Sequence, residues 1–185
     1  MLKGKDNPLR FAVVFVILFV CFYYFNIMYL GLTSPGNHYS TFLHDHLNYI
    51  QWLRTLLLLC SKQVLVWMGY TTIINDEFLR VAGRNMIDVA YSCLGFGVMS
   101  FLAAFNIAYP KPIKQKVLFF IGGVLIFQLL NITRFIVLAL YWKPGNNKII
   151  DHHIIFNVLI YLIILISLYF WTKHDIIATT KHEKS

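Results

Sequence analysis

Two residues within apolar segments, Cys93 and Arg134, are of types that could take part in chemistry. Cys93 follows Ser92 at the start of an apolar run, and a serine is a favoured helix N-cap. We therefore expect the thiol in the first helical turn, where the helix dipole favours the nucleophilic thiolate. Arg134 interrupts another apolar run, where burying a cation costs about 3 kcal/mol or more unless it is paired or hydrated. Asn131 stands three residues before Arg134 and shares its helix face.

Histidines open the last apolar run. His152 and His153 are adjacent there, and Asn157 shares a helix face with His153. Acyl transfer to sulfur needs a thiolate, a proton carrier and positive charge near the developing oxyanion. Cys93 could supply the thiolate and His153 could carry the proton. Arg134 cannot deprotonate at accessible pH, so its part would be to stabilise negative charge.

The composition indicates what kind of protein must position these groups. Hydrophobic residues make up 58% of the 185 residues, only 13% are charged, and the formal net charge is +8. A soluble domain has roughly twice this share of charge, and an aromatic content of 17% excludes a disordered chain. The basic residues flank apolar runs and form no stripe, which argues against nucleic acid as a partner. We expect one integral membrane domain over residues 1–185.

The expected fold is an all-α membrane helix bundle with about four transmembrane helices. A span needs about 20 mostly apolar residues, and four segments fit this description: 11–32, 93–109, 117–142 and 154–171. Residues 47–70 are also apolar, but Arg54 and Lys62 interrupt them, so an interfacial or re-entrant helix is expected there. The first segment is too long for a signal peptide, which predicts an uncleaved anchor.

Charge placement predicts the topology. Short basic loops stay in the cytoplasm, and lysines cluster near the N-terminus, in the tail and in the 111–116 loop. Both termini are therefore expected to be cytoplasmic, with residues 31–92 and 143–152 on the outer side. Residues 86–92 alternate in polarity after the turn-forming residues 82–85, which predicts a small extracytoplasmic β-hairpin just before the Cys93 helix.

The same topology predicts that the three chemical groups reach one level. Cys93 stands 18 residues before Lys111, and Arg134 stands 18 residues after Lys116. A helix rises about 1.5 Å per residue, so each group lies about 27 Å above the inner boundary. His153 precedes Lys173 by 20 residues, which corresponds to about 30 Å. We expect the three side chains to meet near the extracytoplasmic surface.

These motifs, in this order, resemble the exosortase/archaeosortase family, in a compact form similar to the exosortase F type. The resemblance rests on Cys93-x-Gly95, Asn131-x-x-Arg134 and a histidine that opens the last helix, and it covers residues 71–171. It favours His153 over His152. The family often has a serine directly after the cysteine, where this chain has Leu94.

The resemblance implies a membrane-embedded Cys-Arg-His enzyme of the bacterial plasma membrane, with its active site on the extracytoplasmic side. Such enzymes are thought to cleave C-terminal sorting signals of exported proteins and to transfer the product to an acceptor. The implied substrate carries a C-terminal motif, a transmembrane helix and a basic cluster. No cofactor or metal is implied.

Two other functions remain open at the level of the sequence. A metal-dependent membrane hydrolase would use histidines as ligands: His44, His46, His152 and His153. A non-enzymatic assembly or transport subunit would use Arg134 as part of a polar pathway or a subunit contact. Gly95 also has a simpler reading, since small residues permit close helix packing in membranes.

Overall fold

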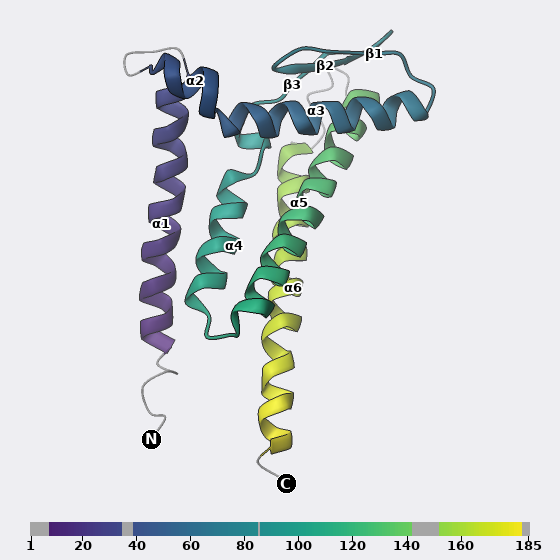
Figure 1. Ribbon diagram of the computed structural model, residues 1–185. Coiled ribbons are helices and arrows are strands. Elements are labelled where there is room, and N and C mark those ends of the chain that lie inside the picture. The colour runs from purple at the N-terminus through teal and green to yellow at the C-terminus, as the bar shows by residue number, and fades with distance from the viewer. Residues whose placement is uncertain (1–7, 35–38, 85, 142–151, 183–185) are drawn as a thin grey trace. The chain divides into compact units, whose positions relative to one another are not determined.

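The computed structural model describes residues 8–34, 39–84, 86–141 and 152–182, and in the last range it describes side chains for 158–173. The helices, in chain order (Figure 1), are α1 (Pro8–Thr33), α2 (Thr41–Leu47), α3 (Tyr49–Trp67), α4 (Phe96–Ala108), α5 (Ile113–Tyr141) and α6 (His152–His182). A short 3-10 turn, η1 (Tyr91–Cys93), precedes α4. The chain divides into two compact units, Met1–Trp142 and Lys143–Ser185, which are described separately.

Helices α1 and α5 are the two described helices that are long and apolar enough to cross a membrane. Their bounds, Pro8–Thr33 and Ile113–Tyr141, contain nearly all of the expected segments 11–32 and 117–142. Helix α4 has only 13 residues, so at about 20 Å it is shorter than the hydrocarbon core. It begins later than the expected segment because the chain breaks its helical path at Gly95, which has a positive φ of 78°.

Aromatic side chains hold α1 against α4. Phe11 and Phe15 of α1 meet Phe105 of α4 edge to face, with ring centroids 5.6 and 6.2 Å apart. Phe15 also meets Phe101 in the same way at 5.3 Å. Edge-to-face pairs add about 0.5–1.5 kcal/mol each beyond their buried area. The four-residue spacing of these phenylalanines places them on one helix face, so the contact continues along both helices.

A three-stranded antiparallel sheet precedes the Cys93 turn. The strands β1 (Thr72–Ile74), β2 (Phe78–Val81) and β3 (Met86–Asp88) pair in the order β1-β2-β3. The strand at 86–88 lies where alternation was expected but is shorter than 86–92, and β1 adds a strand that the sequence analysis missed. The chain leaves the sheet after β3 to form η1.

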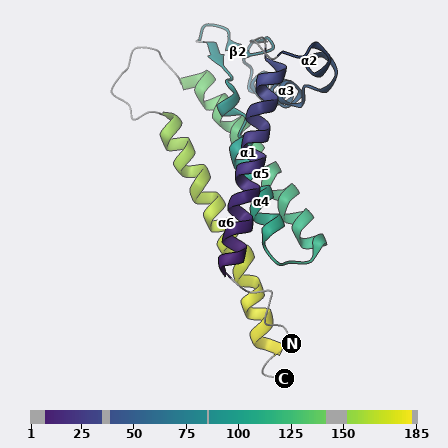
Figure 2. The same cartoon turned by 90° about the vertical axis from the view of Figure 1, so that its left-hand side faces the viewer.

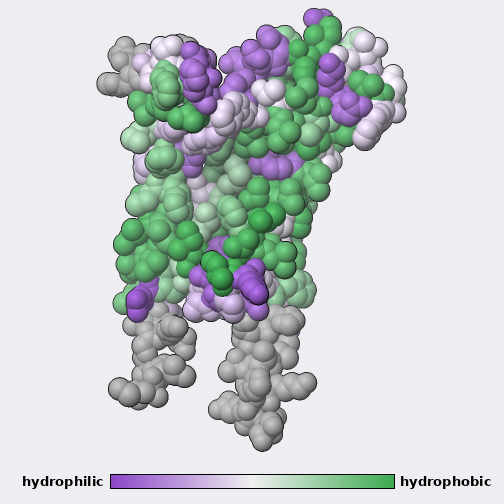
Figure 3. Space-filling view, in the orientation of Figure 1, coloured by the Kyte–Doolittle hydropathy of each residue, from purple (hydrophilic) through white to green (hydrophobic). Residues whose placement is uncertain are grey.

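Helix α3 lies across α4 and α5 at the end of this unit that also carries the sheet (Figures 1 and 2). The α4–α5 connection lies at the opposite end. Apolar residues cover the visible sides of α1, α4 and α5 between these two more hydrophilic ends (Figure 3). This arrangement is that of a helical membrane protein.

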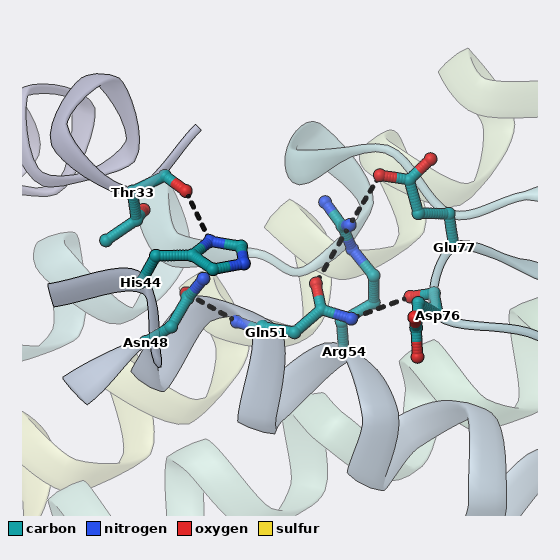
Figure 4. Close-up of polar contacts among 7 residues, drawn as sticks. All are labelled: Thr33, His44, Asn48, Gln51, Arg54, Asp76 and Glu77. Carbon is teal, nitrogen blue, oxygen red and sulfur yellow. Dashed lines mark hydrogen bonds and ion pairs between the residues drawn. The ribbon is translucent and has the colours of Figure 1, made fainter. Parts of the chain in front are cut away.

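Polar contacts fasten α3 to its neighbours (Figure 4). The Asn48 side chain caps α3 by accepting a hydrogen bond from the Gln51 backbone N–H at 3.0 Å. The Gln51 side-chain amide donates to the Asp76 carbonyl oxygen at 2.9 Å. Arg54 donates to Gln51 and forms an ion pair with Glu77 at 3.4 Å. These contacts fix the turn between β1 and β2 onto α3.

Candidate active site

The structure brings Cys93 and Arg134 into direct contact. Arg134 Nη2 donates a hydrogen bond to Cys93 Sγ across 3.8 Å. Both side chains are buried, with 7% of Cys93 and 4% of Arg134 exposed. Because both side chains are buried, little solvent screens the guanidinium charge at the sulfur. The two residues come from η1 and α5, so only the tertiary fold makes them neighbours.

The backbone at Cys93 differs from the expectation. Cys93 ends the 3-10 turn η1, and its N–H donates to the Ala90 carbonyl oxygen at 2.9 Å. Helix α4 begins only at Phe96, and its N-cap is Gly95. The prediction that Ser92 caps the helix and that the thiol lies in its first turn was therefore wrong. Arg134, rather than the first turn of α4, supplies the positive charge nearest the sulfur.

Gly95 allows α4 to approach α5 closely. Its φ of 78° lies in the left-handed region, which favours glycine. A Cβ atom at this position would lie 2.0 Å from Cε1 of Phe127, which is a buried residue of α5. Glycine therefore meets two requirements here, one of conformation and one of space, and both fix the turn that carries Cys93.

Two linked hydrogen bonds lie on α5 in the turns that precede Arg134. Asn131 is 1% exposed and donates through Nδ2 to Gln128 Oε1 at 3.0 Å. The Gln128 amide in turn donates to the Met99 sulfur of α4 at 3.5 Å. Gln128 was not among the predicted site residues, although a polar residue three positions before Asn131 in an apolar span was a usable signal. These bonds link the arginine-bearing helix to α4.

A second polar group, which the sequence analysis also missed, joins α1 to α3 beside η1. The Tyr49 hydroxyl donates to Asn26 Oδ1 at 2.7 Å. Burial raises the pKa of Tyr49 to about 12, with smaller contributions from neighbouring tyrosines that include Tyr91. Phe96 contacts both tyrosine rings, stacking on Tyr91 at 5.3 Å and meeting Tyr49 edge to face at 5.6 Å. These rings pack around the turn that carries the cysteine.

The predicted site histidines, His152 and His153, belong to α6, which lies in a different unit of the chain from Cys93 and Arg134. His152 and His153 begin α6, and Asn157 is in its second turn. Their side chains fall outside the described ones, and α6 belongs to the second compact unit. The meeting of His153 with Cys93 therefore stays a prediction.

The histidines near α2 have other contacts. His44 Nδ1 lies 2.9 Å from the Thr33 carbonyl oxygen, which accepts a hydrogen bond from it at the end of α1 (Figure 4). The His46 ring stacks on Phe42 with centroids 5.1 Å apart. Among the described residues, no group of three metal-ligating side chains comes together. The His44 hydrogen bond therefore joins α2 to the end of α1, whereas the His46–Phe42 stacking lies within α2.

Comparison with known families agrees with the motifs. The family model for transmembrane exosortases matches residues 7–171, which include Cys93, Gly95, Asn131, Arg134 and His153. No curated protein and no solved structure matches the chain. The family match extends well beyond residues 71–171, over which the motifs were aligned, and takes in α1 and α3. The chain therefore belongs to the transmembrane exosortase family.

Proposed function

We propose that this membrane protein is a cysteine peptidase or transpeptidase that cleaves C-terminal sorting signals of exported proteins. The observation that carries the proposal is the buried contact between Cys93 Sγ and Arg134 Nη2 at 3.8 Å. Membership of the exosortase family supports the same chemistry. A thiol held against a permanent cation is a suitable nucleophile, because the cation stabilises the thiolate form.

The first half of the reaction forms a thioester. The thiolate of Cys93 attacks a peptide carbonyl carbon of the substrate, and the carbonyl electron pair moves onto oxygen. Arg134 stabilises the negative charge, which lies first on sulfur and then on the developing oxyanion. The C–N bond breaks, and His153 protonates the departing amine as a general acid. The acyl group then remains on Sγ.

The second half releases the acyl group. An acceptor amine or a water molecule gives a proton to His153 and attacks the thioester carbonyl carbon. The C–S bond breaks and Cys93 returns to the thiolate beside Arg134. An amine acceptor gives transpeptidation and water gives hydrolysis, so the acceptor alone distinguishes the two activities.

The proposed substrate is an exported protein with a C-terminal motif, a transmembrane helix and a basic cluster. The proposed setting is the bacterial plasma membrane, with both termini cytoplasmic and the site on the extracytoplasmic side. Family membership and the basic flanks of the apolar segments support this setting.

The test is processing of a co-expressed exported substrate by three variants: Cys93→Ala, Arg134→Ala and His153→Ala. Each should accumulate in the membrane like the wild type and leave the substrate uncleaved. Cys60→Ala is the matched control, since it removes a half-buried thiol of α3 and should leave processing intact. Cleavage that survives Cys93→Ala would refute the proposal.

Two further measurements define the reaction class. Thiol alkylation should stop processing, whereas a metal chelator should leave it unchanged. The mass of the released product should show either a free carboxylate or an amide to the acceptor. Sensitivity to the chelator with indifference to alkylation would instead favour a metal-dependent hydrolase.

A further inference from the structure

Helix α3 has two apolar faces. The face turned inward is buried and contributes to the same hydrophobic cluster as Cys93; it consists of Ile50, Leu57, Leu58 and Leu65. The other face, here called the outer stripe, is between 46% and 77% exposed and consists of Trp52, Leu56, Leu59, Val66 and Trp67. At about 100° per residue the two sets lie on opposite sides of the helix. Contacts within the described residues bury the inner face of α3 and leave the outer stripe exposed.

The direction of α3 indicates what covers the outer stripe. The two helices able to cross a membrane are α1 and α5, and their direction therefore approximates the bilayer normal. Helix α3 lies crosswise to both, at the end of this unit that carries the sheet (Figures 1 and 2). A helix in this position runs along the surface of the bilayer, where one of its sides can face lipid.

The residues of the outer stripe suit the boundary between headgroups and acyl chains. None of the five is charged, and the exposed Gln63 on the same side of the helix is polar but uncharged. Trp52 and Trp67 stand near the two ends of the stripe, about 22 Å apart along the helix. Tryptophan is enriched at this level of a membrane. By contrast, Arg54 lies away from the stripe, where it pairs with Glu77 of the sheet turn.

We propose that the outer stripe of α3 is seated in the headgroup–acyl boundary of the lipid bilayer. The inner face of the same helix packs into the cluster that holds Cys93. The proposal concerns only the position of α3 in the membrane. It can fail while the proposed cysteine chemistry is correct, and the cysteine chemistry can fail while this proposal is correct.

The test uses tryptophan fluorescence of the full chain in phosphatidylcholine vesicles. Trp142→Phe and Trp171→Phe leave Trp52 and Trp67 as the only tryptophans of the chain. Lipids brominated either near the carbonyl or near the methyl end report depth, and iodide reports contact with water. We expect strong quenching by the shallow bromines, weaker quenching by the deep bromines and little quenching by iodide.

A matched control places a single tryptophan in the middle of α1. Val20 is an exposed residue there, and Val20→Trp, with the four native tryptophans changed to phenylalanine, should be quenched best by the deep bromines. The proposal is overturned if the α3 tryptophans match this deep pattern, because the stripe would then lie in the interior of the bilayer and not at its headgroup boundary. Quenching by iodide alone would mean that the stripe faces water. Quenching by neither agent would mean that α6 or a second copy of the chain covers it.

Discussion

Replacing Gly95 by alanine tests how the Cys93 turn is built. Gly95 has a φ of 78°, and a Cβ atom there would lie 2.0 and 2.2 Å from two ring atoms of Phe127. The substitution adds a single methyl group, yet it opposes both the backbone conformation and the packing of α4 on α5. Among the described glycines, Gly95 alone combines a positive φ with a Cβ position that overlaps another side chain.

The magnitude follows from the two terms. A non-glycine residue in the left-handed conformation costs about 1–2 kcal/mol, and forcing an extra methyl group into a packed site costs about 1–3 kcal/mol. Gly95→Ala should therefore lower the free energy of unfolding by about 2–5 kcal/mol. Gly83 is the matched control, because its φ of 74° is similar but nothing lies within 4 Å of its Cβ position. Gly83→Ala should cost only the first term, about 1–2 kcal/mol.

The assay is reversible unfolding of the purified chain in mixed micelles, followed by circular dichroism during a titration with denaturing detergent. Phe127→Leu provides a second arm, because it removes the ring atoms that the new methyl group would meet. In that background Gly95→Ala should cost only as much as Gly83→Ala. Equal costs for Gly95→Ala and Gly83→Ala in the wild-type background, or no relief from Phe127→Leu, would refute the reasoning.

Two other outcomes follow from the site. Arg134→Gln should slow alkylation of Cys93, because it removes the guanidinium that donates to Sγ and stabilises negative charge there. Arg54→Gln, which alters a cation paired with Glu77, should leave the rate unchanged, and equal slowing by both would contradict the assignment. Burial raises the pKa of Tyr49 in the folded state from its ordinary value of 10.0 to about 12. The neutral hydroxyl therefore stabilises the folded protein fully below pH 10, and this stabilisation is lost as the pH rises through 12. Unfolding titrations of wild type and Tyr49→Phe should therefore converge in stability across this alkaline range, and a parallel pH dependence of the two proteins would show that Tyr49 is not the group responsible.

Several features could be predicted from the sequence because they depend on local composition or on fixed helix geometry. The apolar runs of α1 and α5 are long enough to be recognised by hydropathy alone. Counting residues at α-helical rise predicted that Cys93 and Arg134 lie at one level, and the two side chains are in contact, although Cys93 itself lies in a 3-10 turn outside α4. The alternation at 86–92 likewise marked the position of β3, although not its length.

Other features were decided by tertiary contacts that no local pattern records. Whether Arg134 turns toward Cys93 depends on how α5 is rotated against its neighbours. On α5, Gln128 donates to Met99 and Phe127 lies against Gly95, and both partners are distant in the chain. The N-cap at Ser92 failed for the same reason: capping propensity is local, but the close approach of two helices selected Gly95 as the point where α4 begins. Hydropathy determines which segments enter the membrane, whereas side-chain packing determines which helix faces meet. Only side-chain packing could bring the sulfur of Cys93 and the guanidinium of Arg134 together.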